Sequence, residues 1–421
     1  MSNKQKTPLL PKLRFPEFRS AGDWTTEKLG SVASISTEKV GSAACVPMSI
    51  TSGVGLVSQE DKFGRVIAGD SYKNYLLLKP NDFAYNKSAT KEYPEGFLAL
   101  HSGSKLAAVP NSIFTCFRVN GKSPIPTYLN YLFLGNLHGL WLRKFIQVGA
   151  RAHGSLSIND SDLMALPVPL PTGDSSVAEQ QKISDCLSSL DELIAAQARK
   201  VAALKTHKKG LMQQLFPREG ETRPYLRFPE SRNGGEWKKM TLGQAATFYN
   251  GRAYKQEELL ESGKYPVLRV GNFFTSNTWY HSDLELDDTK YCENGDLLYA
   301  WSASFGPRVW RGKKSIYHYH IWKVVEQHGI DKQFLFVTLE NETERMKAKS
   351  TNGLGIMHIT KGAIESWETT FPALAEQRKI AHWLINLDNT ISEETRKLEV
   401  LARHKNGLLQ RLVPFLDETP T

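Results

Sequence analysis

The chain has 421 residues, of which 40% are hydrophobic, and its formal net charge is +9 at pH 7. This length predicts two to three domains, and no window approaches the roughly 18 uninterrupted apolar residues of a membrane helix. The opening residues also lack the apolar core of a signal peptide, so we expect a cytosolic protein. The positive charge favours a polyanionic partner, although a solvated surface with a small excess of lysine has the same composition.

Two stretches of the chain occur twice. Leu13 to Gly30 (LRFPEFRSAGDWTTEKLG) matches Leu226 to Gly243 without gaps, with 10 identities in 18 positions. Glu179 to Pro217 matches Glu376 to Pro414 in the same way, with 18 identities in 39 positions. Such self-similarity indicates a tandem duplication. Each half begins with an L-R-F-P-E segment, continues through a variable segment and ends in a long helix.

The variable segments, Ser31 to Ala178 and Gln244 to Ala375, correspond only in fragments, and the first is about fifteen residues longer. Both contain a short D-x-x-Y strand, DFAY at Asp82 and DLLY at Asp296. Short runs of Val, Tyr, Phe and Trp, separated by Gly, Asn and Pro, predict an α+β domain in each segment. The predicted parts are an α+β domain at 1–178, a helix at 179–217, an α+β domain at 218–375, a helix at 376–414 and a tail at 415–421.

Both predicted helices carry apolar residues at alternating spacings of four and three. These residues are Ile183, Leu187, Leu190, Ile194, Val201, Leu204, Leu211 and Leu215 in the first helix, and Ile380, Leu384, Leu387, Ile391, Leu398, Leu401, Leu408 and Leu412 in the second. The pattern is typical of a coiled-coil seam, so we expect the helices to pair with each other. The alternative is that each helix packs on its own domain. A helix of this length is a rod of roughly 50 Å, which could hold two domains on separated patches of a DNA duplex.

We expect the pairing to be antiparallel, because equivalent domains on a dyad-related duplex face opposite ways. One register sets Lys208 against Glu394 and gives every polar seam position a polar partner. Its other contacts are Gln197 with Lys405, Val201 with Leu401, Leu204 with Leu398 and Leu211 with Ile391. A register one heptad away sets Ile183 against Leu412 but leaves Lys208 facing Leu387. We expect the first register, because burying an unpaired ammonium costs a few kcal/mol, against roughly 1 to 2 kcal/mol for each additional apolar contact.

The sequence contains no recognisable catalytic constellation. G-x-S-x-G, H-E-x-x-H and the N/D-P-P-Y/F motif of adenine methyltransferases are absent, and GPRVWRGKKS (Gly306 to Ser315) has one residue too many for a Walker A loop. SATK at Ser88 matches S-x-x-K without its companion motifs. His318 and His320 are predicted on one face of a strand, without a third ligand nearby. We predict neither a catalytic residue nor a metal site.

Basic and amide side chains lie among aromatic residues in predicted turns of both variable segments. Arg and Lys recognise guanine edges, Asn recognises adenine, and Ser or Lys can hold phosphates. In the first segment the candidate DNA-binding residues are Asn86, Lys87, Ser88, Lys91, Tyr93, Arg151, His153 and Ser155. In the second segment they are Arg252, Tyr254, Lys255, Arg269, Asn272, Ser302, Ser304, Arg308, Lys349 and Asn352. A solvated turn is the alternative for any single residue, but the set favours DNA.

The repeated motifs resemble those of the specificity (S) subunit of type I restriction-modification systems. That family carries a repeated helix with an E-Q-x-K-I start and an L-D-x-x-I continuation. Here the matching residues are Glu179, Gln180, Lys182, Ile183, Leu190, Asp191 and Ile194, and then Glu376, Gln377, Lys379, Ile380, Leu387, Asp388 and Ile391. The L-R-F-P-E entries and the HKKGLMQQLFP ending also look like the family. TTFP at Thr369 departs from the first half, which has VPLP, but only in a connector.

The resemblance implies two target recognition domains, separated by a long antiparallel two-helix coiled coil, that read a bipartite and asymmetric DNA site. It implies two modification subunits that carry S-adenosylmethionine and methylate adenine at N6, and restriction subunits that use ATP and Mg²⁺. This chain would then hold no cofactor and catalyse no reaction, and its helices would offer equivalent docks to the modification subunits. Two alternatives stay open: an autonomous two-domain DNA-binding regulator, and an enzyme fused to recognition domains.

Overall fold

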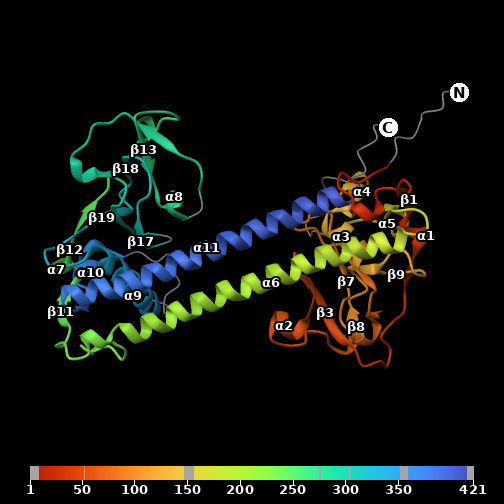
Figure 1. The fold of residues 1–421 in the computed structure, drawn as a ribbon, viewed down its shortest axis with the longest axis horizontal. Coiled ribbons are helices and arrows are strands. Elements are labelled where there is room, and N and C mark those ends of the chain that lie inside the picture. The colour runs from red at the N-terminus through yellow and green to blue at the C-terminus, as the bar shows by residue number, and fades with distance from the viewer. Residues whose placement is uncertain are drawn as a thin grey trace. The chain divides into compact units, whose positions relative to one another are not determined.

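A computed structural model describes residues 9–51, 53–146, 156–274, 276–302, 305–350 and 359–414 (Figure 1). The chain divides into two compact units, which we call unit 1 (Met1–Gln197 with Lys397–Thr421) and unit 2 (Ala198–Arg396). There are two long helices, α6 (Ser176–Leu215) and α11 (Leu374–Leu412). One part of each helix belongs to unit 1 and the other part to unit 2. Both begin and end two to three residues before the predicted bounds. Within the described ranges, no helix is both long and apolar enough to cross a membrane.

Unit 1 is an α+β structure built on three small sheets. Its strands are β1 (Thr25–Lys28), β2 (Ala33–Ser36), β3 (Val46–Thr51), β4 (Gly55–Ser58), β5 (Leu76–Leu78), β6 (Phe83–Asn86), β7 (Phe97–Leu100), β8 (Ala107–Val109), β9 (Phe114–Val119) and β10 (Pro167–Leu170). Its shorter helices are α1 (Leu29–Val32), α2 (Gln59–Phe63), α3 (Pro126–Leu134), α4 (Leu137–Leu142) and α5 (Asp160–Met164). The strands pair in the orders β2-β9-β6-β7, β4-β3-β8-β5 and β1-β10.

Unit 2 has the same strand order with different contents. Its strands are β11 (Lys238–Thr241), β12 (Ala246–Asn250), β13 (Tyr265–Leu268), β14 (Tyr280–Ser282), β15 (Tyr291–Cys292), β16 (Leu297–Ala300), β17 (Gly306–Val309), β18 (Ser315–Tyr317), β19 (Ile321–Glu326) and β20 (Glu368–Phe371). Its shorter helices are α7 (Leu242–Ala245), α8 (Val270–Phe274), α9 (Lys332–Ser350) and α10 (Lys361–Glu365). The sheets run β12-β19-β16-β17, β14-β13-β18-β15 and β11-β20. Each unit also contains a parallel pair at the same place, β3 with β8 and β13 with β18.

The two D-x-x-Y segments form inner strands of equivalent sheets, β6 and β16, as predicted. The aspartate before each strand fixes the neighbouring strand. Asp82 receives two hydrogen bonds from Arg118 of β9, at 2.6 and 2.7 Å, and Asp296 pairs with Lys323 of β19 at 2.8 Å. The tyrosine of each motif is fully buried. These shared residues therefore hold the common scaffold, because they join strands that are distant in sequence.

Each unit has a main hydrophobic core that includes one end of both long helices. In unit 1, Trp24 belongs to the same cluster as Ile183 and Leu187 of α6 and Leu409 and Leu412 of α11. The corresponding residues of unit 2 are Trp237, Leu215, Ile380 and Leu384. Most of the remaining seam leucines and isoleucines are only half-buried. The ends of the predicted seam thus pack into the cores, so the alternative of packing on a domain is correct for these ends.

The L-R-F-P-E segment of unit 1 is held against the first turns of α6. Arg14 donates two hydrogen bonds to Glu179, both 2.7 Å long, and the side chains are only 8% and 1% exposed. Lys182, one turn further along the helix, pairs with Glu17 at 3.2 Å and lies 5.7 Å from the ring centre of Phe15. The entry motif and the E-Q-x-K-I motif therefore contact each other directly.

Unit 2 repeats this set of contacts residue by residue. Arg227 donates to Glu376 through Nε, at 2.9 Å, and through Nη2. Lys379 pairs with Glu230 and lies 5.4 Å from the ring centre of Phe228. The strongest sequence repeat of the chain thus encodes a clamp between each entry segment and the start of the following long helix. We call these contacts the entry clamps.

Ion pairs show that α6 and α11 run in opposite directions within unit 2. Lys200 of α6 pairs with Glu394 at 3.1 Å, whereas Lys208, two turns later in α6, pairs with Asp388 at 2.7 Å. The partner in α11 therefore moves backward as α6 moves forward. In unit 1, Lys405 of α11 forms the equivalent pair with Asp191 of α6. The predicted antiparallel direction is confirmed inside unit 2.

The predicted register was wrong by nearly one heptad. Lys208 contacts Asp388, which follows Leu387, and not Glu394. The prediction treated a lysine facing Leu387 as unpaired, because it considered seam positions alone. Asp388 flanks the seam and Glu340 of α9 reaches the same ammonium at 3.0 Å. Although burial lowers the pKa of Lys208, these carboxylates raise it on balance, so the lysine stays charged at its half-buried position.

Candidate nucleic-acid interface

The first candidates in unit 1 lie at the last residue of β6 and directly after it. The side-chain oxygen of Asn86 accepts a hydrogen bond from the backbone N–H of Ser88 at 3.0 Å, which forms a tight turn. Lys87 pairs with Asp160 at 3.3 Å, and the hydroxyl of Thr115 donates to the same carboxylate at 2.8 Å. These side chains are therefore already engaged by the chain itself.

Lys91 and Tyr93 lie on the connection between β6 and β7. The backbone N–H of Thr90 donates to the carbonyl of Tyr93 at 3.1 Å, and Thr90 Oγ1 accepts from Tyr93 N at 3.0 Å. This turn leaves Lys91 exposed at its tip. The ring of Tyr93 stands edge-on to Phe97 with 4.8 Å between ring centres. Lys91 is thus available to a ligand, whereas Tyr93 partly belongs to the local core.

Five sequence candidates lie outside the described residues. They are Arg151, His153, Ser155, Ser304 and Asn352. Their assignment as DNA-binding residues therefore stays a prediction from the sequence.

Arg252, Tyr254 and Lys255 follow β12 in unit 2. The guanidinium of Arg252 donates two hydrogen bonds to Glu258, at 2.9 and 2.6 Å, and lies 5.3 Å from the ring centre of Tyr254. Burial raises the pKa of Tyr254, so its phenol stays protonated near neutral pH. Lys255 is 76% exposed and reaches Glu257 only at 3.8 Å. Arg252 is thus fixed in place, and Lys255 projects into solvent.

Arg269 and Asn272 lie on the connection between β13 and β14. Asn272 accepts a hydrogen bond from the backbone of Arg269 at 3.1 Å and donates to the carbonyl of Thr278 at 2.9 Å. It therefore closes the turn. The guanidinium of Arg269 lies 4.3 Å from the ring centre of Tyr280, and its Nε has no hydrogen-bond partner among the described residues. That Nε is buried, and Nη2 donates to the carbonyl of Thr278 at 3.5 Å, so the guanidinium is held at this turn.

The remaining described candidates differ in exposure. Ser302 follows β16 and is only 5% exposed. Arg308 of β17 is exposed, with its guanidinium 5.0 Å from the ring centre of Phe274. Lys349, near the end of α9, pairs with Glu219 at 2.6 Å. Of these three residues, Arg308 is the one best placed to meet a ligand.

His318, Tyr319 and His320 form a turn between β18 and β19, so the prediction that they lie on the face of a strand was wrong. The turn is closed by a hydrogen bond from Ile321 N to the carbonyl of His318, at 2.9 Å. The whole stretch consists of residues that are common in strands, so composition alone does not reveal the break. In the described part of the chain, no group of three or more His, Cys, Asp or Glu could hold a metal ion.

This turn brings together residues from three parts of unit 2: the segment after β12, the residue after β16 and the turn itself. Arg252 forms a parallel bridge with His318, and Tyr319 N donates to the carbonyl of Arg252 at 3.0 Å. Trp301 donates its indole N–H to the carbonyl of Tyr319 at 2.7 Å and meets the ring of His320 at 4.9 Å. We call this group the turn cluster. Its members are Arg252, Tyr254, Trp301, His318, Tyr319 and His320.

The turn cluster combines ring faces with hydrogen-bonding groups. Tyr319 is 40% exposed. Burial and the nearby charges of His320 and Arg269 lower the pKa of His318 to about 4, so its imidazole is neutral at pH 7 and can both donate and accept. Ring faces stack on bases, and guanidinium and imidazole groups bind base edges or phosphates. Trp301 and Tyr319 are not among the residues predicted from the sequence, although the position of Trp301 directly after the D-x-x-Y strand is a usable signal.

Comparison with known proteins identifies the class. Residues 234–403 match the family described as the type I restriction modification DNA specificity domain. The structure is also similar to the S subunit of a type I restriction-modification system from M. genitalium, with a TM-score of 0.56 and 16% identity, covering 97% of this chain and 100% of that one. A chain from a structure of the assembly and conformational transition of a type I R-M system has the same TM-score and identity, covering 92% and 97%. At this identity the likeness shows the fold.

Two relatives from Methanocaldococcus jannaschii agree with this class. The type I restriction enzyme MjaVIII specificity subunit is 29% identical over 190 residues, which span 44% of this chain and 43% of that protein. The putative type I restriction enzyme MjaX specificity subunit is 24% identical over 336 residues, 76% of this chain and 74% of that protein. The resemblance inferred from the repeated motifs is therefore confirmed: the chain is similar to type I specificity subunits, which supports a role in DNA sequence specificity.

Proposed function

We propose that this chain is the DNA-recognition subunit of a type I restriction-modification complex and that it reads a bipartite, asymmetric site. Residues 1–178 and 218–375 would each read one half of the site, and the helices at 179–217 and 376–414 would form the coiled-coil spacer between them. The proposal rests on the DNA specificity domain match and on the two units themselves, which share one strand order but differ in their surface loops.

The observation that carries the proposal is the contrast between scaffold and loops. The entry clamps recur in both units with the same contacts, and the D-x-x-Y strands recur at the same place in the sheet. In contrast, the loop after the D-x-x-Y strand carries Lys91 and Tyr93 in unit 1 but begins with Trp301 in unit 2. A duplicated scaffold with unlike loops is suited to reading two unlike sequences, because specificity comes from side chains at base edges.

The proposed partners are duplex DNA, two modification subunits that bind S-adenosylmethionine, and restriction subunits that use ATP and Mg²⁺. Exposed apolar side chains on the long helices support a docking role for these helices. Leu193 of α6 and Val400 of α11, both in unit 1, are 49% and 47% exposed, and Trp383 of α11 in unit 2 is 46% exposed. The chain itself would hold no cofactor and would transfer no methyl group.

Co-purification of the tagged chain from its host tests the proposal. We expect two copies of a methyltransferase per chain, and we expect N6-adenine methylation at one bipartite sequence in host DNA that disappears when the gene is deleted. Purified chain with S-adenosylmethionine and DNA should transfer no methyl group. A chain that binds one DNA sequence without any methyltransferase would instead be an autonomous regulator, and methyl transfer by the chain alone would contradict the proposal.

A further inference from the structure

The near-Walker stretch at Gly306 to Ser315 adopts a structure of its own in unit 2. Its first residues form β17, its last residue begins β18, and Trp310 to Lys314 connect the two strands. Because a strand and not a helix follows the connection, it lacks the helix N-terminus that cradles the phosphates of a bound nucleotide. Arg311, Lys313 and Lys314 are nevertheless all exposed on this short connection. We call residues 310–314 the basic loop.

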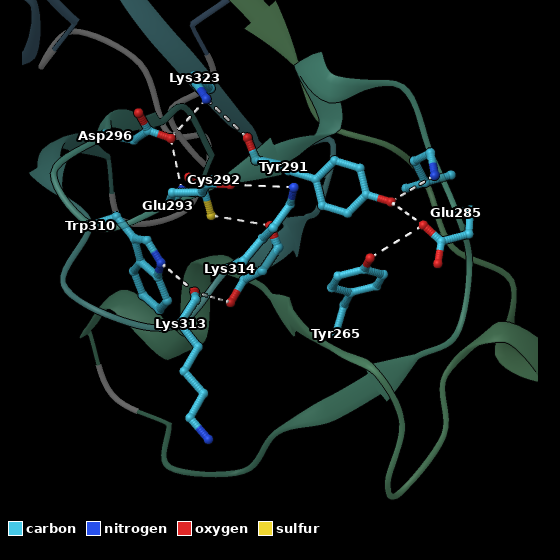
Figure 2. A network of polar contacts seen from close by, with 12 residues as sticks. Tyr265, Glu285, Tyr291, Cys292, Glu293, Asp296, Trp310, Lys313, Lys314 and Lys323 are labelled. Carbon is cyan, nitrogen blue, oxygen red and sulfur yellow. Dashed lines mark hydrogen bonds and ion pairs between the residues drawn. The ribbon is translucent and has the colours of Figure 1, made fainter.

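The basic loop is held in one conformation by hydrogen bonds to its own backbone. The carbonyl of Lys313 accepts from Trp310 Nε1 at 3.0 Å and from Ser315 Oγ at 2.9 Å (Figure 2). Trp310 is itself anchored, because its backbone N–H donates to the carbonyl of Asp296 at 2.8 Å. A Cβ on Gly312 would lie 2.5 Å from the Trp310 ring, so only glycine allows this close approach. The loop is therefore organised before any ligand binds.

The three basic side chains of this loop differ in whether they have an ion-pair partner. Lys314 pairs with Glu293 at 3.3 Å and lies 4.6 Å from the ring centre of Tyr291. In contrast, the side chains of Arg311 and Lys313 make no hydrogen bond or ion pair with any described residue. Figure 2 shows the Lys313 side chain extending away from the network of the other labelled residues. The loop thus displays two positive charges that no described residue compensates.

We propose that Arg311 and Lys313 bind phosphates of the DNA backbone and so position unit 2 on the duplex. This inference rests on the proposed function and deepens it, because it assigns a contact that carries no sequence information. A rigid loop loses little conformational entropy when it binds, and cations without partners need not break an existing ion pair. The loop would hold unit 2 in register while the turn cluster and Arg269 meet the base edges.

The test compares the wild-type chain with the R311Q/K313Q variant, each in complex with its modification subunits. Binding is measured by fluorescence anisotropy over a range of salt concentrations, on a duplex containing the methylated host site and on a scrambled duplex of equal length. We expect the variant to bind both duplexes more weakly by the same factor. The slope of log K against log salt should become shallower by about 1.8, since two phosphate contacts are lost. The methylated sequence should not change.

Two further variants make the result specific to the loop. K238Q removes from β11, which belongs to another sheet, an exposed lysine that has no partner among the described residues, and it should leave the salt slope unchanged. Trp310→Phe keeps a ring but loses the hydrogen bond to the Lys313 carbonyl. It should therefore weaken binding to both duplexes by the same factor, and this factor should be smaller than for R311Q/K313Q. These comparisons separate a local phosphate contact from a general loss of positive charge.

Opposite outcomes would overturn the inference. If R311Q/K313Q keeps the wild-type slope, the loop does not touch phosphates. If the variant binds only the host-site duplex more weakly, these residues read bases. A wild-type complex that binds both duplexes equally would contradict the proposed function, yet the loop would still be tested by the salt slope. A wild-type complex that binds no duplex DNA would overturn both.

Discussion

Arg14 and Glu179 form a two-point ion pair across 165 residues of sequence, and both side chains are less than one tenth exposed. Arg227 and Glu376 form the same pair in unit 2. The residues that best reveal the duplication are therefore those that close each entry segment onto its long helix. A buried charge without its partner is costly. A single substitution in either pair should therefore lower the free energy of unfolding.

The Arg14→Met variant should lower the free energy of unfolding by about 3 kcal/mol, because it leaves the Glu179 carboxylate buried without a cation. Chemical denaturation followed by circular dichroism measures the change. The double variant R14M/E179M should recover much of the loss, since neither charge remains. A loss below about 1 kcal/mol in the single variant would place this pair with ordinary surface salt bridges.

The helix register can be tested by double-mutant cycles on Lys208. Lys208→Met combined with Asp388→Asn should show a coupling energy of about 1 kcal/mol, because the two side chains contact each other. Lys208→Met combined with Glu394→Gln should show none, since Glu394 pairs with Lys200. Urea denaturation of the three single and two double variants provides the measurement. Coupling to Glu394 alone would restore the register that the sequence suggested.

The buried imidazole of His138 should make the protein sensitive to acid. Burial lowers the pKa of His138 to about 4. Between pH 6.5 and pH 4, His138 is therefore protonated in the unfolded chain but neutral in the folded chain. The free energy of unfolding should therefore fall as pH drops from 7 to 4, by about 3 kcal/mol for a shift of this size. His138→Phe, which suits the contact with Phe133, should flatten this part of the curve. An equally steep curve in that variant would assign the acid sensitivity to other groups.

Arg269 should contribute to base recognition in one half of the DNA site. Arg269→Lys keeps the charge but loses the planar fork and its stacking on Tyr280. The variant complex should lose about 1 to 3 kcal/mol of discrimination at one half-site, while binding to scrambled DNA changes little. Competition binding with base-substituted duplexes measures this. Uniform weakening on all sequences would make Arg269 a backbone contact.

Exchange of Ser31 to Ala178 for the corresponding segment of a related protein should change one half of the methylated sequence and leave the other half unchanged. The reason is that this segment lies between the two repeated motifs whose entry clamp closes unit 1. Methylation-sensitive long-read sequencing of the host provides the measurement. A hybrid that altered both half-sites would show that the two units do not read independently.

Local patterns were enough to predict several features of this chain. The spacing of apolar residues from Ile183 to Leu215 predicted a continuous helix, and the identical entry motifs predicted two equivalent units. The D-x-x-Y segments were recognised as strands because the two copies agree. Such features depend on short-range periodicity or on direct repetition, and both can be read without knowing which residues meet in space.

Other features depend on partners that only the folded chain brings together. Glu340 lies 132 residues from Lys208 in sequence, yet it supplies one of the charges that permit the observed register. The sequence shows a strand-like run at His318 to His320, whereas tertiary contacts with Arg252 and Trp301 accompany a turn there. The sequence by itself determined the duplication, the long helices and the class of protein. The tertiary structure decided the register and the grouping of the candidate DNA contacts, because each depends on the energies of side chains that are distant along the chain.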